Sequence, residues 1–550
     1  MPAITFGHLT HTGSANTVWD VRVARFGFAQ DSLPSTGDRT IASRFDNVTG
    51  ITRDAPPSFS QLRIARTTAK AILSRYRPAF MGVDHEWKIG GQAEKGRHDS
   101  ITIVPTGVRF IDRDRQPLQA VSSSPSHIGG EFITAAVFAT DAISIGDRLT
   151  ISLGVRFDHT RAISPALTAV DLQGDESGAT VAGLGTMYTW NVVSPRAGIV
   201  ARLTPDGRTL LRGSYGRFSQ GVLTGELEPF HPGASPVTTA EFEQASGDYT
   251  RILQVVDNRN LRFDRDTRAP RTHEYSVGID RELGRHVSVA TAYVRKNGAN
   301  FIGWTDNGGE YRQETRTLAD GRIVPVQALA TAPGSRLYLL TNPPGCSLTY
   351  NGLVMALAKR PSHGWQVSGS YTLSRAYGLQ SSSGTSAAGP QASTVSPPQP
   401  LTFGRDPNDL TNAHGRLPND RPQIVRVMGT FDVPRTGLVV AANFQYFSGK
   451  PWAVTALVPL PQNNSYRVLL EPRGTQRLPS QSLLDLRVSR VFGTNHLGRF
   501  ELLVDVLNAL NETAEEEIAT DYVFSPNLGQ PTRFVDPRRA MLGVRWHLGR

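Results

Sequence analysis

The sequence feature that most constrains the fold is a set of segments in which apolar and polar residues alternate one by one. In LTISLGVRFD (149–158) every second residue from Leu149 to Phe157 is apolar, and the residues between them are small, polar or charged. The same pattern occurs in WQVSGSYTLS (365–374), LLDLRVSRVF (483–492) and AMLGVRWHL (540–548). Because successive side chains of a strand point to opposite faces, this period predicts strands with one apolar and one polar face.

The connections between these segments alternate in length. Short ones carry turn residues, as in SIGDR (144–148), TPDGR (204–208) and VPRTG (433–437). The long ones are rich in Gly, Pro, Ser, Asn and Asp and cover 162–194, 218–272, 296–348, 377–420, 449–481 and 510–537. Compact soluble domains rarely contain loops longer than ~12–15 residues. Short periplasmic turns alternating with long outer loops are typical of outer-membrane β-barrels.

Composition agrees with a barrel and excludes other classes. No apolar run approaches the ~18 residues that a membrane helix needs. Hydrophobic residues make up only 39% of the chain, which suits a wall that shows lipid every second residue. A single cysteine rules out a disulfide scaffold. The net charge of +10 comes from scattered arginines without a dense basic run, so we expect no nucleic-acid partner.

The predicted fold class is all-β: a large transmembrane antiparallel β-barrel of about 20–22 strands. Residues 1–129 are expected to supply early strands and loops, and 130–550 the remainder of the same barrel. Candidate early strands are 17–28, 69–77, 85–94 and 101–110, and residues 322–341 are a candidate hairpin. Such a barrel lies in the outer membrane of a Gram-negative bacterium, in contact with lipid.

Several segments together resemble the barrel of TonB-dependent outer-membrane receptors, in the group with an N-terminal carboxypeptidase-regulatory-like domain. They are SPRAGIVARLTPDGRTLLRGSYGRFSQG (194–221), PRTHEYSVGIDRELGRHVSVATAYVRK (270–296), YNGLVMALAKRPSHGWQVSGSYTLSRAYG (350–378), DPNDLTNAHGRLPNDRPQ (406–423), and LLDLRVSRVF with RFELLVDVLNALN (483–492, 499–511). The resemblance implies external loops that capture a scarce ligand such as a siderophore or a glycan. It also implies a plug that completes the site and a TonB complex that supplies energy.

The front of the chain does not resemble the family's signal peptide, TonB box or plug. We therefore expect the barrel part of a longer protein, with a genuine plugless barrel as the alternative. The last strand resembles the signal read by the barrel-assembly machinery at Gly543, Trp546 and Leu548, although the chain ends in Gly549 and Arg550.

The polar strand faces carry charges of both signs that are expected to face the lumen. They are Arg156, Asp158, Arg212, Asp280, Asp485, Arg487, Glu501, Asp505 and Arg545. One interpretation is a network that satisfies itself on the inner wall. The other, which we favour, is a docking surface for the plug.

The ligand contacts are expected in the external loops 218–272, 296–348 and 377–420. One of these loops holds Asp406, Asn408, Asp409 and Asn412, whose oxygen atoms are suitable ligands for Ca²⁺, although Asx-rich turns have the same composition. We found no GxSxG, P-loop or HExxH motif, and therefore predict no enzyme and no cofactor.

Two other functions remain open. A passive pore or structural outer-membrane barrel has the same strand pattern. A soluble secreted β-protein such as a propeller requires a repeat of ~40–50 residues, which the sequence lacks.

Overall fold

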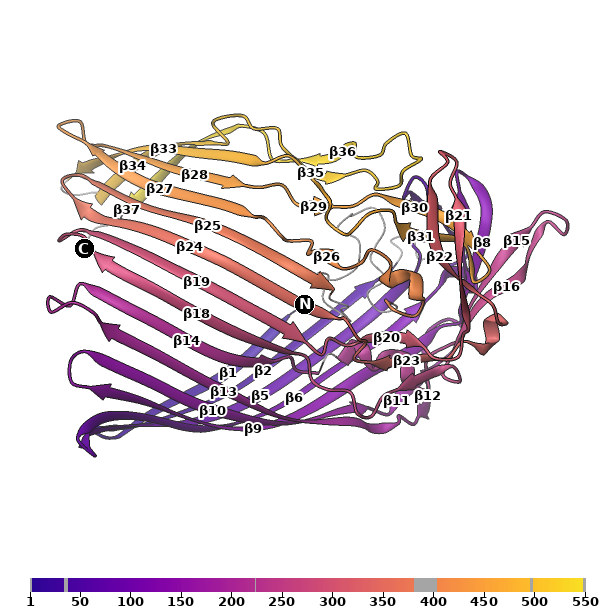
Figure 1. Cartoon of the computed structure of the whole chain (residues 1–550), viewed down its shortest axis with the longest axis horizontal. Coiled ribbons are helices and arrows are strands. Elements are labelled where there is room, and N and C mark those ends of the chain that lie inside the picture. The colour runs from indigo at the N-terminus through magenta and orange to yellow at the C-terminus, as the bar shows by residue number, and fades with distance from the viewer. Residues whose placement is uncertain (1, 34–37, 223, 380–402, 495–497, 548–550) are drawn as a thin grey trace.

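The computed structural model describes residues 2–33, 38–222, 224–379, 403–494 and 498–547, and these residues are almost entirely β-structure (Figure 1). Helical structure in these ranges consists of five short 3-10 turns. None of the helices in this part of the chain is long and apolar enough to cross a membrane.

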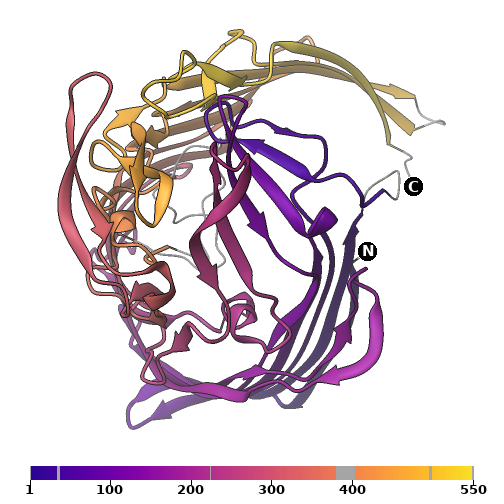
Figure 2. The same cartoon turned by 90° about the vertical axis from the view of Figure 1, so that its right-hand side faces the viewer.

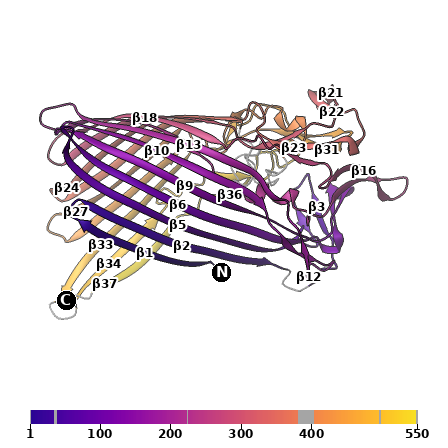
Figure 3. The same ribbon diagram turned by 90° about the horizontal axis from the view of Figure 1, so that it is seen from below.

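Long antiparallel strands form the wall, each paired with the next along the chain. The wall strands are β1 (Ala3–Ser14), β2 (Thr17–Ser32), β5 (Phe59–Phe80), β6 (Val83–Ile103), β9 (Ser126–Ile145), β10 (Leu149–Ser164), β13 (Gly185–Arg202), β14 (Thr209–Ser219), β18 (Arg271–Glu282), β19 (Val287–Ala299), β24 (Ser347–Ser362), β25 (Trp365–Leu379), β27 (Gln423–Val433), β28 (Leu438–Phe447), β33 (Gln481–Thr494), β34 (Gly498–Leu507) and β37 (Arg539–His547). The short β26 (Gly415–Arg416) pairs with β25 and brings the sheet to 18 strands. Figures 2 and 3 show the sheet curving into a barrel wall, and no described residues pair β1 with β37.

The alternation of apolar and polar residues in the sequence gives the wall strands two different faces, as predicted. On β10, the apolar Leu153, Val155 and Phe157 remain exposed, whereas Thr160 and Ala162 on the opposite face are buried. The same holds on β18, where Val277 and Ile279 are about half exposed. An apolar face of this extent is stable only when lipid covers it, so it is the outer face of the wall.

Hairpin turns join the strands at one end of the wall, and long connections join them at the other (Figure 1). The turn between β13 and β14 is the TPDGR segment, where Gly207 has a φ of +68°, which glycine adopts without strain.

The long connections are folded and contain small sheets of their own. The largest has six strands in the order β16-β15-β8-β7-β3-β4. The loop strands are β3 (Ser43–Asp46), β4 (Thr52–Arg53), β7 (Val108–Arg113), β8 (Gln116–Ser122), β11 (Leu167–Val170), β12 (Glu176–Val181), β15 (Val237–Glu243), β16 (Asp248–Val256), β17 (Leu261–Phe263), β20 (Gly303–Asp306), β21 (Tyr311–Thr317), β22 (Ile323–Leu329), β23 (Tyr338–Thr341), β29 (Pro451–Trp452), β30 (Thr455–Leu460), β31 (Asn463–Leu469), β32 (Gln476–Arg477), β35 (Glu515–Ile518) and β36 (Pro531–Phe534).

The all-β prediction is confirmed, but the described wall has fewer strands than the expected number. The reason is strand length: β5 has 22 residues and β6 has 21, about twice the minimum for crossing a bilayer. The candidate strand 101–110 leaves the wall at Ile103 and continues through the 3-10 turn η1 (Pro105–Gly107) into β7. Within 322–341, β22 pairs with β21 and β23 pairs with β17 and β20, so neither strand joins the wall.

The main apolar core lies between the inner face of the wall and the loops. Tyr188 and Trp190 of β13 pack in one cluster with Phe230, Trp304 and Tyr338 from the long connections. The Trp190 indole also donates a hydrogen bond of 2.8 Å to the Thr267 carbonyl. These contacts fix the first loops against the wall.

We predict that Phe230→Ala loosens the loops without disturbing the wall. Phe230 is buried and stacks on Trp304 at 5.5 Å between ring centres, and its loss leaves a cavity costing roughly 3–5 kcal/mol. Amide hydrogen exchange over 224–263 measures the effect. Phe431→Ala is the matched control, because Phe431 lies exposed on the outer face. Unchanged exchange in the Phe230 variant would contradict this packing.

Candidate functional site

The loops expected to contact ligand lie together over one end of the barrel (Figure 2). Strand β17 of the first loop, 218–272, pairs in parallel with β23 of the second, 296–348. The third loop, 377–420, contributes the 3-10 turn η5 (Pro407–Leu410) and β26, and its residues 380–402 lie outside the described part of the chain. Loops separated in sequence are thus joined by backbone pairing.

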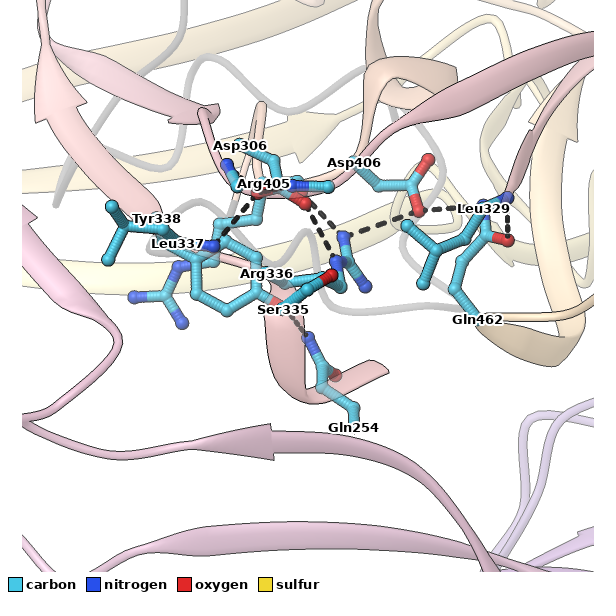
Figure 4. A network of polar contacts seen from close by, with 12 residues as sticks. Gln254, Asp306, Leu329, Ser335, Arg336, Leu337, Tyr338, Arg405, Asp406 and Gln462 are labelled. Carbon is cyan, nitrogen blue, oxygen red and sulfur yellow. Dashed lines mark hydrogen bonds and ion pairs between the residues drawn. The ribbon is translucent and has the colours of Figure 1, made fainter. Parts of the chain in front are cut away.

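A buried ionic cluster joins the second and third loops (Figure 4). The Arg336 guanidinium is 3% exposed and donates to Asp306 Oδ2 at 2.9 Å and to the Arg405 carbonyl at 2.6 Å. It also lies 3.5 Å from Asp406 Oδ2. Asp306 accepts further hydrogen bonds from the Tyr311 hydroxyl and the backbone of Leu337. Every charge in this cluster has partners, as burial requires.

Arg405 lies beside this cluster and has no carboxylate partner among the described residues. Its guanidinium carbon is 4.0 Å from the centre of the Trp304 ring and 5.2 Å from that of Tyr338. Its Nε is buried without a hydrogen-bond partner. Burial lowers the pKa of Arg405 to about 10, against the effect of the Tyr338 ring, so the group remains a cation at neutral pH.

Three of the four candidate calcium ligands accept hydrogen bonds from the loops' own donors, and the fourth, Asn412, donates one. Asp406 caps η5 by accepting from the Asn408 backbone at 3.0 Å, and it also accepts from the Gln462 amide. Asn408 exchanges two 2.8 Å hydrogen bonds with the Gln327 backbone. Asp409 accepts from the Tyr466 hydroxyl, and Asn412 donates to the Leu469 carbonyl at 2.9 Å. These contacts hold the third loop against the neighbouring loops.

Burial and the neighbouring Asp406 raise the pKa of Asp409 to about 7. Among the described residues, no group of three or more His, Cys, Asp or Glu side chains is placed to hold a metal ion. The calcium site stays a prediction without geometric support.

A hairpin formed by β30 and β31 connects the later loops with the earliest ones. Asn463 accepts a 2.9 Å hydrogen bond from Gln119 on β8, and Asn47 donates to Ser465 Oγ at 2.9 Å. The Asn464 amide donates to Glu241 on β15 at 2.7 Å. No motif in the sequence signals these contacts, which join residues more than 200 positions apart.

The charges predicted to face the lumen lie on the inner face and pair largely with one another. The closest N–O distances are 2.8 Å for Arg156–Asp158, 2.5 Å for Arg212–Asp280, 2.5 Å for Arg487–Asp505 and 3.0 Å for Arg545–Glu501. Asp485 accepts from the Asn443 amide at 3.4 Å and the Asn508 backbone at 3.0 Å. This geometry satisfies the charges within the wall, and docking of a plug stays a prediction.

An open recess of about 580 Å³ lies on this part of the wall, with Asp485, Arg487 and Asp505 in its lining. Gln366 and Asn443 also line it and were not singled out from the sequence. The strand register alone places them there, opposite Thr430 and Asp485 respectively.

Two of the three residues of the proposed assembly signal lie in β37. Trp546 stacks on Phe500 of β34, with 5.4 Å between ring centres, and Gly543 is opposite Leu503. Leu548 lies outside the described residues. Recognition by the assembly machinery stays a prediction.

The family model described as "Outer membrane beta barrel domain" matches residues 118–456, more than half of the chain. No curated protein matches the sequence. Among solved structures, similar folds include the ferric-catecholate import receptor Fiu from K12 E. coli (14% identity, TM-score 0.54), the outer membrane transporter YddB from Escherichia coli (13%, 0.57) and the pyoverdine outer membrane receptor FpvA from Pseudomonas aeruginosa PAO1 (13%, 0.55).

These matches cover 99%, 99% and 100% of this chain but only 63%, 62% and 61% of the three structures, respectively. The chain thus spans less than two thirds of their length. At these identities the likeness establishes the fold.

We predict that Arg336→Met releases the second loop from the third. The substitution leaves Asp306 and Asp406 buried without their cation, which costs roughly 3–5 kcal/mol. Hydrogen exchange and protease cleavage over 303–341 should both increase. Arg312→Met, at an exposed position on β21, is the control and should behave as wild type. Equal protection in both variants would show that the ionic cluster does not hold the loops.

The packed conformation of the first long loop, 218–272, in which Glu226 is buried, should lose stability as the pH rises. Burial raises the pKa of Glu226, in the 3-10 turn η2 (Thr224–Glu226), to about 8. Glu226 therefore keeps its proton while the loop is packed. When the loop opens and exposes Glu226, the side chain loses that proton above the usual glutamate pKa of about 4. The contribution of Glu226 to the stability of the packed loop is full below about pH 4, falls by up to about 1.4 kcal/mol per pH unit, and levels off above about pH 8.

Hydrogen exchange over 224–230, corrected for the intrinsic pH dependence of exchange, measures this loss. Glu226→Gln should remove it, whereas Asp248→Asn, an exposed position in the same loop, should retain it. A pH dependence that persists in Glu226→Gln would assign it to another group.

Proposed function

The chain belongs to the outer membrane β-barrel domain family, and from this premise we propose that it is the barrel of a receptor for TonB-coupled uptake of a scarce ligand. Its place is the outer membrane of a Gram-negative bacterium, with the apolar strand face against lipid. We favour an iron-bearing siderophore over a glycan, because two of the similar structures are named as a ferric-catecholate import receptor and a pyoverdine receptor.

The observation that carries the proposal is that the long connections at one end of the barrel are folded and held together. We call this set of loops the cap. Its parts are held by the buried ion pair of Arg336 and Asp306, by backbone pairing of β17 with β23, and by the β30–β31 hairpin. A passive pore gains nothing from ordering long loops at this cost in conformational entropy. A receptor does, because a preorganised surface binds ligand without paying that cost again.

In this proposal the loops bind the ligand, and a plug inside the barrel completes the site and is moved by TonB. The paired charges of the inner wall give the plug a polar surface to dock against. The barrel-assembly machinery inserts the barrel through its last strand. No covalent step is required, so the function needs neither an enzymatic group nor a cofactor.

Ligand binding by the full chain in detergent tests the proposal. Iron-loaded catecholate and pyoverdine-type siderophores are the probes, and quenching of tryptophan fluorescence is the readout, since Trp304 lies in the cap. Arg405→Gln should weaken binding by loosening the loops in which the Arg405 side chain packs on Trp304 and Tyr338. Arg312→Gln, at an exposed position on β21, is the control and should bind as wild type.

The absence of saturable binding for either probe would overturn the receptor proposal in favour of the pore.

A further inference from the structure

A fully buried histidine lies in the first long loop, 218–272. His231 follows the 3-10 turn η3 (Glu228–Phe230) and ends it by donating its backbone N–H to the Glu228 carbonyl at 3.0 Å. The residue is 0% exposed, and no carboxylate of the described residues forms an ion pair with its ring. An imidazole in such a place is stable only when both of its ring nitrogens have hydrogen-bond partners.

The partners of the two ring nitrogens fix the protonation state of His231. Nε2 lies 2.8 Å from the Pro165 carbonyl, which can only accept, so Nε2 carries a hydrogen. Nδ1 lies 3.0 Å from the backbone N–H of Gly233, which can only donate, so Nδ1 offers a lone pair. The ring is therefore the neutral Nε2–H tautomer. A proton on Nδ1 would set two donors against each other.

These two bonds hold the first loop to its neighbours. Pro165 belongs to the preceding long connection, between β10 and β11. Gly233 lies directly against the start of β9, because a Cβ at this position would be 2.5 Å from the His127 carbonyl. Two residues further on, Ser235 Oγ donates to the Pro125 carbonyl at 2.8 Å. The neutral ring thus fixes the chain where the loop meets the wall.

The residues before His231 pack on the same strand. A Cβ at Gly130 of β9 would lie 2.5 Å from the Thr224 carbonyl and 3.1 Å from Leu227 Cδ1, so the loop backbone covers this glycine. Leu227 is 0% exposed and belongs to the same apolar cluster as Phe230. Residues 224–235 therefore pack on β9 as one segment, and we call it the latch segment.

The charged groups on the neighbouring strands are already paired. His127 of β9 lies 2.7 Å from a backbone carbonyl of β11 and 3.5 Å from Asp99 Oδ2 on β6. His98 of β6 lies 2.6 Å from Glu228 Oε1. Neither carboxylate contacts His231, so a proton on this ring would create a buried cation without an anion, which is costly.

The remaining charged groups around the latch segment do not change this conclusion. The Asn258 amide donates to the His231 carbonyl at 3.2 Å, and the adjacent Asp257 pairs with Arg259 at 2.7 Å. Burial lowers the pKa of His231 below its usual range, against the effect of the bond to the Pro165 carbonyl, and the nearby His127 lowers it further.

We propose that His231 is a proton-sensitive latch of the first long loop. The neutral ring holds the latch segment on β9, and protonation of Nδ1 releases it. The packed loop excludes a proton that the opened loop takes up below the usual histidine pKa of about 6.5. The contribution of His231 is therefore full above about pH 6.5 and is lost as the pH falls below that value. The latch acts on loop conformation, so it does not depend on the receptor proposal.

Glu226 lies in the same segment and has the opposite pH dependence. Opening of the loop releases the Glu226 proton and loads His231, so the two effects offset each other in wild type between about pH 4 and pH 6.5. Glu226→Gln removes the first effect and leaves the second. His98 and His127 add little below about pH 6.5, because they are protonated there in both the packed and the opened loop.

Hydrogen exchange of the full chain in detergent tests the latch. The measured segment is 224–235, in Glu226→Gln at pH 6.5 and pH 5.0, with rates corrected for the intrinsic pH dependence of exchange. The opening equilibrium should rise on the order of tenfold between these two values, because one proton is taken up on opening. Exchange over 149–158 of β10 should not change.

The double variant Glu226→Gln, His231→Gln should abolish this rise. Glutamine offers one donor and one acceptor but takes up no proton. The ratio of opening at the two pH values is compared, so a loop that is looser at both still gives an answer. The matched control is Glu226→Gln with His363→Gln, an exposed histidine in a short turn at the other end of the wall, and it should keep the rise.

Two outcomes would refute the latch. One is an unchanged opening equilibrium in Glu226→Gln between pH 6.5 and pH 5.0. The other is a rise that persists in full when His231 is replaced, which would assign the proton to another group.

Discussion

The constraint on which this structure depends is that lipid offers no hydrogen bonds to the backbone. Each N–H and C=O within the bilayer must find a partner in the protein, and an antiparallel ladder from β1 to β37 supplies those partners strand by strand. The alternation of side chains follows from that ladder. Lipid accepts only apolar groups on one face, so polar groups are confined to the other, where Arg487 and Asp505 neutralise each other.

Outside the bilayer the same chain is under different constraints. Water can hydrogen-bond to the backbone of the loops, so the long connections need no regular structure. Most of them nevertheless form small sheets and are joined by buried charges. Arg336 illustrates the balance: its desolvation is costly, and it is offset by Asp306, Asp406 and a carbonyl in one place. Order in the cap therefore rests on a few polar clusters and on several apolar cores, including the one around Trp304.

The wall could be predicted from the sequence because a barrel strand needs only local information. Segments 17–28 and 69–77 lie within β2 and β5, and the pairing of Arg156 with Asp158 follows from their positions two residues apart on one face. The number of strands could not be predicted, because apolar loop strands such as β22 have the same alternation as a wall strand, and because strand length is set by how far each strand projects from the membrane.

The cap was largely beyond sequence reasoning. Asp406 and Asp409 have the composition of a calcium loop, and only the positions of Gln462 and Tyr466, more than 50 residues away, show them to be anchors.

The β30–β31 hairpin has a consequence for the order of assembly. Its residues Asn463 and Ser465 bond to Gln119 and Asn47, which lie over 300 positions earlier, so these bonds cannot form until the chain has been made as far as Ser465. Contacts between residues so far apart in sequence cost loop-closure entropy before they stabilise the fold, so they form late in folding. The earliest loops are thus joined to the later ones only after most of the chain has been made.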